Sequence, residues 1–511
     1  MQNDKNTTKE KAVLENLVGS KTEWLETTIN LADKNPAKIL SVSACFFVDS
    51  TEVLLGEVNY SGTLTSNLLY QKEDGTVDNL QASTSINGKF ENGLFVVDGA
   101  IRVVPNIISN DLEKVNGDTA KLKTNIELSF YQLQNQELDV YSGGEEDIFV
   151  KQSEIPLSNF TNKNCFTFTQ PIILDCKSKL EKILSVSTGA IVKKATVLDS
   201  VVVLEGDVFA NTLATIDGEP NKFVALSNIE SFREEVEDGT AKKDSLIEAY
   251  ARVICENVET NFLEENLGIE IQVPVKACYE LFENKNITVV TDAYAIKNEL
   301  TISTTGFNST EFLGNENFEF KIDGNVSLDE NLPRIDKVLA VDGAYLTLTN
   351  VAYEDRELLV EGIARATVIY LNDDENTINS VVVEIPFSQT ERTTLDEHDV
   401  NVKLQTIFYN VDATAKRGRE LFVDGKVKLV AWFNKSVANA IISNIERGEE
   451  VQANNAAIEI YYAAHGQTLW DVAKDLRVSE NVLKNQNPNL TEPFINEEKI
   501  VYYNQKTAQI D

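Results

Sequence analysis

The chain has 511 residues, enough for three or four domains of ordinary size, and its hydrophobic content of 42% is normal for a globular protein. Its formal net charge of −35 argues strongly against non-specific nucleic-acid binding, which needs Lys and Arg side chains facing phosphates. No stretch approaches the roughly eighteen consecutive apolar residues of a transmembrane helix, so no membrane span is expected. We interpret the acidity as a solubility feature, with a basic partner as the alternative.

The N-terminal segment is polar and has no apolar core of the kind that a secretory signal needs. Its first thirteen residues read MQNDKNTTKEKAV. We therefore expect residues 1–13 to form a flexible tail, and we expect the protein to stay in the cytoplasm where it is made.

A short motif repeats along the chain. Lys38–Ser43 (KILSVS) recurs unchanged as Lys182–Ser187, and Lys337–Val341 is a looser copy. A glycine follows each motif lysine by 24 or 25 residues, and a phenylalanine follows each glycine by 25 to 28 residues. These markers, which we expect to be structural, are Gly62, Gly206, Gly362, Phe90, Phe232 and Phe387. A period of about 150 residues is too long for a solenoid, so the sequence predicts three tandem copies of one globular domain.

The copies are rich in strand-forming patterns. Residues 357–371 alternate between an apolar and a more polar face, with the period of a half-buried strand. Equivalent runs cover 201–215 and 53–70, and turn signals separate such runs. The sequence predicts a mainly β protein, with three sandwich-like or barrel-like repeats and a small α+β C-terminal domain. We assign the repeats to 14–158, 159–307 and 308–445, a polar linker to 446–456 and the C-terminal domain to 457–505.

The repeats resemble the SPOCS domain, also called DUF3794. The third copy carries the resemblance most clearly, in a strand–Gly–strand–Tyr pattern from Leu359 through Gly362 to Tyr370. An acidic–Pro–Phe pattern follows in Glu384–Phe387, and the second copy matches at Val203–Gly206. The first copy is more divergent.

Catalytic and metal-binding patterns are scarce. The five cysteines include no Cys-x-x-Cys motif, so we expect reduced, mostly buried thiols rather than a disulfide framework or a zinc site. The only histidines that could act as a catalytic base or metal ligand are His398 and His465, and the phosphate-binding motif GxxxxGK[ST] is absent. A carboxylate pair of glycosidase type stays open, because nothing singles out one pair among 81 acidic residues. We expect no enzymatic activity, no metal and no cofactor.

The C-terminal segment has the pattern of a small α+β domain. β-prone runs at 460–462 and 500–503 flank two helical segments. Thr468 opens the first helix and forms a capping box with Asp471, and Ser479 opens the second. The predicted order is strand, helix, helix, strand.

This segment resembles the LysM domain. The family pattern of an aromatic strand, Gly-Asp-Thr-Leu, an aromatic residue and Asn-Pro-Asn corresponds to Tyr462, Gly466–Leu469, Trp470 and Asn487–Asn489. The resemblance implies a shallow binding groove lined by Gly466, Gln467, Thr468, Leu469, Trp470, Asn487, Pro488 and Asn489. Leu469 and Trp470 have the alternative role of filling the small core. Gln467 replaces the usual Asp, and Glu497–Glu498 replace a Pro-Gly, which alters one wall of the groove.

Three SPOCS-like copies followed by a LysM-like domain resemble SipL-type spore coat morphogenesis proteins, over roughly residues 14–504. The resemblance implies a non-enzymatic scaffold in the mother cell that tethers the coat to the forespore surface. It further implies that the LysM domain binds a SpoIVA-like coat ATPase, with other coat proteins as further candidate partners. The alternative is a cell-wall or cortex protein that binds the N-acetylglucosamine glycans of peptidoglycan. A third alternative is a baseplate component of a phage or injection machine.

Overall fold

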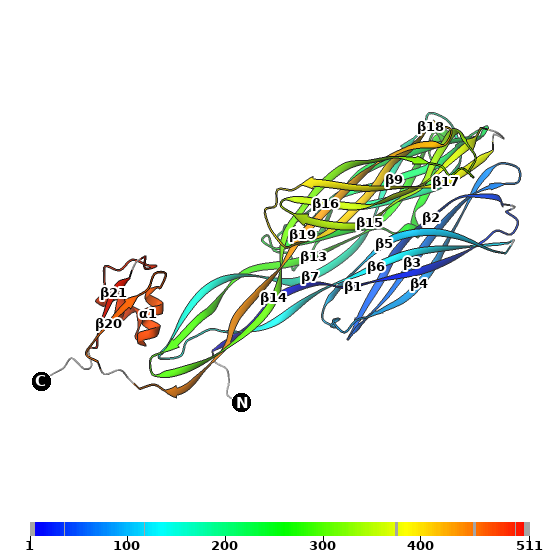
Figure 1. Ribbon diagram of the computed structural model, residues 1–511. Helices are drawn as coiled ribbons and strands as arrows, with labels where there is room; N and C mark the ends of the chain where they lie inside the picture. Colours follow the sequence, from blue (N-terminus) through cyan, green and yellow to red (C-terminus); the bar gives the residue numbers. More distant parts are fainter. Residues whose placement is uncertain are drawn as a thin grey trace.

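The structure of the protein is a computed structural model that describes residues 6–34, 36–116, 118–373, 377–452, 456–495 and 497–504. The chain forms an elongated body of long antiparallel strands and a small lobe near its C-terminus (Figure 1). Strand accounts for 77% of the residues and helix for 4%, which confirms the prediction of a mainly β protein.

We divide the chain into three β units and a C-terminal unit. The first unit contains β1 (Thr7–Asn30), β2 (Pro36–Leu54), β3 (Glu57–Lys72), β4 (Val77–Glu91), β5 (Ala100–Asn116) and β6 (Thr119–Tyr141). The second contains β7 (Ile148–Asp175), β8 (Leu180–Leu198), β9 (Val201–Ile216), β10 (Glu219–Glu237), β11 (Leu246–Val253), η1 (Cys255–Asn257), β12 (Glu259–Phe262), η2 (Glu264–Asn266) and β13 (Gly268–Ala295). The third contains β14 (Asn298–Ser327), β15 (Ile335–Glu354), β16 (Glu357–Asn372), β17 (Ile378–Arg392), β18 (Val400–Arg417) and β19 (Glu420–Glu450). The C-terminal unit contains β20 (Ile458–Ala463), α1 (Leu469–Leu476), α2 (Glu480–Gln486) and β21 (Glu498–Tyr503).

The three β units share one strand order. Each has a meander sheet of three consecutive strands: β2-β3-β4, β8-β9-β10 and β15-β16-β17. Each also has a long-strand sheet, in which the last strand pairs with the first strand and with a later one: β1-β6-β5, β7-β13-β11 and β14-β19-β18. In the second unit the short strand β12 also pairs with β13.

The middle strand β16 shows how the sequence produces a meander sheet. Its first half alternates, with Leu358, Val360 and Ala364 buried in the core of the third unit. From Ala366 to Tyr370 every residue is buried, because the other two units also cover this half of the strand. The imperfect alternation of the sequence therefore reflects a strand that is covered on one face at one end and on both faces at the other.

The three meander sheets pack against one another in a ring. β8 contacts β4, β2 contacts β17, and β15 contacts β10, so each sheet touches both of the others. One apolar cluster joins all three, and it consists of Leu40, Leu69, Val77, Leu184, Leu213, Ala340, Ile369 and Ile378. The motif lysines reinforce the same contacts: Lys38 donates to the backbone oxygen of Ile378 at 3.2 Å, and Lys182 pairs with Asp78.

The long strands continue past the meander sheets and form a narrower stalk toward the C-terminal lobe (Figure 1). The pairs β1/β6, β7/β13 and β14/β19 meet there around a second shared cluster. Its members are Ala12, Leu138, Val140, Leu157, Ile287, Val289, Phe307 and Ile441.

Buried charges lie where the three units meet. Lys403 of the third unit is 2.5 Å from Glu15 of the first and also contacts Glu248 of the second. Arg102 of the first unit lies 2.7 Å from the same Glu248. These side chains are at most 6% exposed, and removal of one would leave its partner buried and uncompensated. The network therefore constrains how the units can dock.

The marker glycines sit where a side chain would not fit. In the third unit Gly362 is directly opposite Phe387, and a Cβ at this position would lie 2.5 Å from the Thr347 carbonyl oxygen. In the second unit Gly206 is likewise opposite Phe232. The glycine thus leaves room for the facing aromatic ring and for the neighbouring strand.

The first unit departs from this marker pattern. Gly62 is opposite Ile86, and the ring of Phe46 lies over it instead. Phe90 is four residues further along β4, opposite Val58.

The strands run through the boundaries that the sequence suggested. The expected boundary after residue 158 falls within β7, and the one after residue 307 falls within β14. The strand order instead starts again after the turns 142–147 and 296–297. The composition did not indicate this, because polar residues at these points, such as Ser158 and Ser309, are buried within paired strands.

The expected tail and linker are partly strand. Residues 7–13 belong to β1, whereas 1–5 lie outside the described residues. Residues 446–450 complete β19, whereas 453–455 lie outside the described residues.

The expectation of reduced thiols is wrong for four of the five cysteines. Cys165 and Cys278 are directly opposite on β7 and β13 and form a disulfide. Cys45 of the first unit forms a second disulfide with Cys255 of the second, which leaves Cys176 free. Spacing along the chain did not indicate these pairs, because strand register and packing between units create them.

We expect Gly362→Ala to destabilise the protein by about 1–3 kcal/mol, because its Cβ would overlap the Thr347 carbonyl and the Phe387 ring. Thermal or urea unfolding of the full chain measures the change. Gly306→Ala is the matched control on β14, where the nearest atom to the new Cβ is 3.9 Å away. Equal stability of the two variants would contradict the steric explanation.

Candidate interaction site in the C-terminal unit

The C-terminal unit has the predicted order of strand, helix, helix, strand. β20 and β21 pair antiparallel, with Ile458 opposite Tyr503 and Ala463 opposite Glu498. The capping box at the start of α1 is present, since the Thr468 amide donates to the Asp471 carboxylate at 2.7 Å. α1 ends at Arg477, whose φ of 52° breaks the helix.

The loop before α1 is held by its own residues. The side-chain oxygen of Gln467 accepts from the Ala464 amide at 2.8 Å, and its amide nitrogen donates to the Tyr461 hydroxyl at 3.2 Å. The Gly466 amide donates to the Phe494 carbonyl at 2.8 Å. The loop therefore lies beside the segment that follows α2.

Asn487 joins α2 to β21. Its side-chain nitrogen donates to the carbonyls of Leu483 and Val501 at 2.9 and 2.8 Å, and its side-chain oxygen accepts from the Val501 amide at 3.0 Å. These bonds use the side-chain groups that would otherwise be available to a ligand.

The eight residues of the expected groove fall into three sets. Leu469 and Trp470 are buried in the core of the unit, at 1% and 8% exposure. The side chains of Gln467, Thr468 and Asn487 are held by hydrogen bonds within the unit. The exposed set consists of Gly466, Pro488 and Asn489.

Trp470 also docks the unit onto the stalk. Its indole N–H donates to the Asp292 carboxylate at 2.8 Å, and its ring meets the ring of Tyr294 edge-on, with centroids 4.9 Å apart. Lys474, one turn further along α1, lies 2.6 Å from the other oxygen of Asp292. The Tyr294 hydroxyl donates to the Val478 carbonyl at 2.7 Å. One face of α1 is therefore covered by the end of β13.

The docking carboxylate stays ionised over a wide pH range. Burial alone would raise the pKa of Asp292, but the hydrogen bonds from Lys474 and Trp470 outweigh it and hold this pKa below its usual range. A lowered carboxylate pKa stabilises the folded form above the unfolded pKa of about 4, and this contribution is lost as the pH falls through the folded value.

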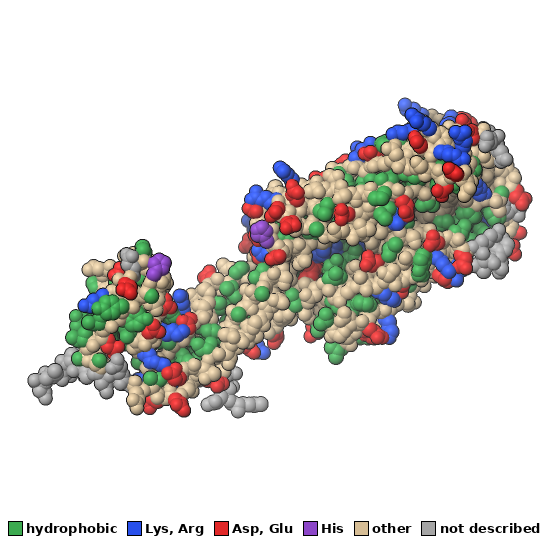
Figure 2. Space-filling model, in the orientation of Figure 1, with side chains coloured by type: hydrophobic (Ala, Val, Ile, Leu, Met, Phe, Trp, Pro, Cys, Tyr) green, Lys and Arg blue, Asp and Glu red, His purple; other side chains and the backbone are tan. Residues whose placement is uncertain are grey.

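On the strand side, the C-terminal unit exposes apolar side chains. Ile458, Ile460 and Tyr462 alternate along β20 on one face and are 57%, 51% and 65% exposed. Tyr503, opposite Ile458, is 50% exposed. We call these four residues the β20 face, and Figure 2 shows hydrophobic side chains gathered on this lobe. The sequence predicted the strand, but only the docking of α1 on the stalk shows which side is left uncovered.

A cleft of about 880 Å³ adjoins the β20 face, between the C-terminal unit and the end of the stalk. Tyr503 lines it together with Val482 and Leu476 on one side and Lys297 and Gln452 on the other. None of the eight expected groove residues lines this cleft, so it is distinct from the groove that the sequence suggested.

The described residues contain neither a metal-binding cluster nor a membrane-spanning helix. No group of three or more His, Cys, Asp or Glu side chains there is arranged to hold a metal ion. None of the helices in this part of the chain has the length and apolar character needed to cross a membrane.

Comparison with known families gives one match. Residues 334–416, which span β15 to β18, match the family described as SipL, SPOCS domain. The match includes Gly362 and Phe387 and points to a sporulation-related protein of SipL-like type. No curated protein and no solved structure matches the chain.

We expect Asp292→Asn to loosen the C-terminal unit from the stalk, because Lys474 loses its ion pair. Hydrogen exchange of the α1 amides should become about tenfold faster, which corresponds to one lost charge-assisted hydrogen bond. In the parent chain, this protection should be constant from pH 5 to 8 and weaken below about pH 4.

The matched control is Asp147→Asn, which removes a surface ion pair with Lys297 at the same end of the stalk. If the α1 amides exchange at the same rate in both variants, Asp292 does not anchor the C-terminal unit to the stalk.

Proposed function

We propose that this protein is a non-enzymatic scaffold of the spore coat, and that its three β units are SPOCS domains. The family match at residues 334–416 supports this for the third unit. The strand order shared by all three units, and the Gly–Phe pairs at Gly206 and Gly362, extend the argument to the others.

We further propose that the C-terminal unit is a LysM domain that recognises a protein partner, a SpoIVA-like coat ATPase. The observation that carries this proposal is the β20 face. Ile460 and Tyr462 are more than half exposed on the two-stranded sheet of β20 and β21, beside a cleft that Tyr503 lines. Exposed aromatic and aliphatic side chains grouped on one face are typical of protein interfaces. Other coat proteins are candidate partners of the β units.

A glycan-binding role is the second candidate. It rests on the exposed set Gly466, Pro488 and Asn489, which a sugar chain could contact. Glu497, next to this region, is exposed and carries a negative charge. Because the remaining groove residues are engaged within the unit, the protein partner is the better supported of the two. The scaffold proposal implies that the protein localises to the mother-cell side of the forespore surface.

The test compares binding of the full chain to a SpoIVA-like ATPase and to purified peptidoglycan. We expect Ile460→Ser to weaken binding to the ATPase about tenfold or more, as removal of a central apolar contact does. Val382→Ser, at a 65% exposed strand position of the third unit, is the matched control and should bind normally.

Asn489→Ala separates the two candidates, and it should leave binding to the ATPase unchanged. The protein-partner proposal would be overturned if the parent chain is retained on peptidoglycan, Asn489→Ala is not, and Ile460→Ser still is. That result would establish a protein that binds the cell wall or cortex.

A further inference from the structure

A small cavity lies between the first and second units, apart from the C-terminal unit. Its volume is about 280 Å³. β2 and β5 of the first unit form one wall, and β7, β11 and β13 of the second form the other. Four cationic side chains line it: Arg102, Lys163, Arg252 and Lys276. In a chain with a net charge of −35, such a concentration of positive charge needs a physical reason.

Strand register places these side chains in ordered rows on the second unit's sheet. Arg252 of β11 is directly opposite Lys276 of β13. The next row is Tyr250 opposite Cys278, which is bonded to Cys165 of β7.

The row beyond that pairs two acids, Glu248 opposite Glu280. It is neutralised by cations from three strands. Arg102 lies 2.7 Å from Glu248, and Lys403 contacts the same carboxylate. Lys163 lies 3.1 Å from Glu280. Glu248 is therefore paired with two cations and Glu280 with one, although neither Glu280 oxygen accepts a hydrogen bond.

The row of Arg252 and Lys276 has no ion pair of this kind, although the Lys276 ammonium lies 5.5 Å from the centre of the Phe47 ring. Among the described residues, none makes a hydrogen bond or an ion pair with the Arg252 guanidinium, and the Lys276 ammonium donates only to the backbone oxygen of Asp49, at 2.9 Å. Asp49 is the one acidic residue among those that line the cavity, and its carboxylate accepts from Thr63 at 3.1 Å.

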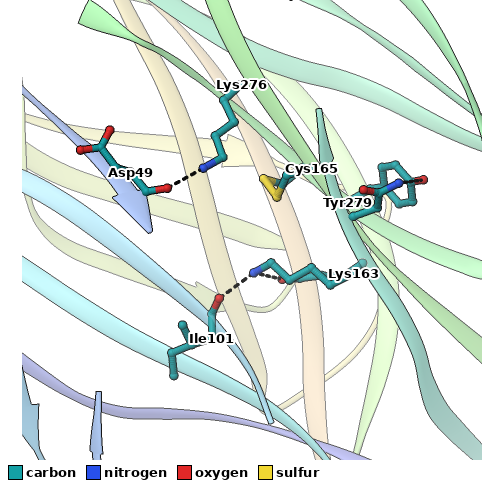
Figure 3. Close-up of a disulfide and its surroundings, with 9 residues drawn as sticks. Asp49, Ile101, Lys163, Cys165, Lys276 and Tyr279 are labelled. Carbon is teal, nitrogen blue, oxygen red and sulfur yellow. Dashed lines mark hydrogen bonds and ion pairs between the residues drawn. A yellow bond between two sulfur atoms is a disulfide. The ribbon is translucent and has the colours of Figure 1, made fainter. Parts of the chain in front are cut away.

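The close-up in Figure 3 shows how the lysines frame this region. Lys163 and Lys276 reach from the second unit toward the first on either side of Cys165, and they donate to the backbone oxygens of Ile101 and Asp49. On this side of the cavity, two lysines of the second unit thus donate to the backbone of the first unit.

Two like charges directly opposite on a sheet destabilise the fold, and the cost rises when they are withdrawn from water. Both residues are partly buried, and burial lowers the pKa of Arg252 to about 10 and also lowers the pKa of Lys276. Departures of this kind from the packing rules are typical of binding sites, where a ligand supplies the missing charge.

We propose that this cavity binds a phosphate-sized oxyanion between Arg252 and Lys276. The guanidinium offers a planar pair of donors that fits two oxygens of phosphate, and the lysine adds a point charge opposite it. The volume admits a small anion or the phosphate end of a phosphomonoester. Because Lys276 also holds Asp49 of the first unit, the bound anion would strengthen the seam between the first and second units.

The experiment measures the melting temperature of the full chain in sodium phosphate and in sodium chloride at equal ionic strength. We expect phosphate to raise the melting temperature in a saturable manner beyond the effect of chloride, as a ligand specific to the folded state does. Glycerol phosphate in a parallel series shows whether a phosphomonoester is accepted or only the free ion.

In Arg252→Met the melting temperature should no longer rise with phosphate. Without phosphate and at low salt, this variant should be at least as stable as the parent, because it removes one of two positive charges that face each other. Arg233→Met is the matched control on the same unit, at a 53% exposed arginine paired with Glu205 and Glu235. Equal responses to phosphate in the two variants would overturn the proposal, as would equal effects of phosphate and chloride on the parent.

Titration calorimetry of the parent with phosphate, and of Lys276→Met, completes the test independently of whether Arg252→Met folds. The proposal requires saturable binding by the parent and an affinity about tenfold or more lower in Lys276→Met. Absence of binding heat in the parent, together with an absent thermal response, would refute it.

Discussion

The packing of the three meander sheets against one another is the constraint on which the rest of the protein depends. It explains the recurrence of the KILSVS motif: Leu40 and Leu184 lie in one shared cluster, and the equivalent Leu339 packs against it. Lys38 and Lys182 each reach a strand of a neighbouring unit. With the meander sheets closed into a ring, the long-strand sheet of each unit is brought beside those of the other two, and the long strands share a second cluster. The stalk, the buried charges and the cavity between the first two units all follow from that arrangement.

The C-terminal unit depends on the stalk in turn. A domain of this size has a small core, and Trp470 serves that core while its indole N–H reaches Asp292 on β13. The helix side of the unit is thereby committed to the body of the protein. The strand side, with Ile460 and Tyr462, is left exposed. A residue that the family resemblance assigns to a ligand groove thus has an anchoring role in this chain.

Local patterns in the sequence were sufficient for the mainly β class, for the strand at 357–371 and for the capping box at Thr468. These features depend on residues close together in the chain. The docking of Trp470 was not predictable in this way, because Asp292 is 178 residues distant. The disulfide between Cys165 and Cys278 depends on register across β7 and β13, and the role of Arg252 depends on what faces it from another strand. Such relations between strands are absent from spacing and composition.

The buried contacts of Glu15 have a consequence for how the chain must be made. Its partners Lys403 and Asn434 are 388 and 419 residues further along the chain. A ribosome that adds about 5–20 residues per second needs on the order of half a minute to reach them. Throughout that interval the Glu15 carboxylate has no partner from the third unit. The apolar surface of the first unit that the third unit later buries is exposed to solvent. We expect the nascent chain to need protection by a chaperone until the third unit has emerged, because Glu15 gains its buried partners Lys403 and Asn434 only then.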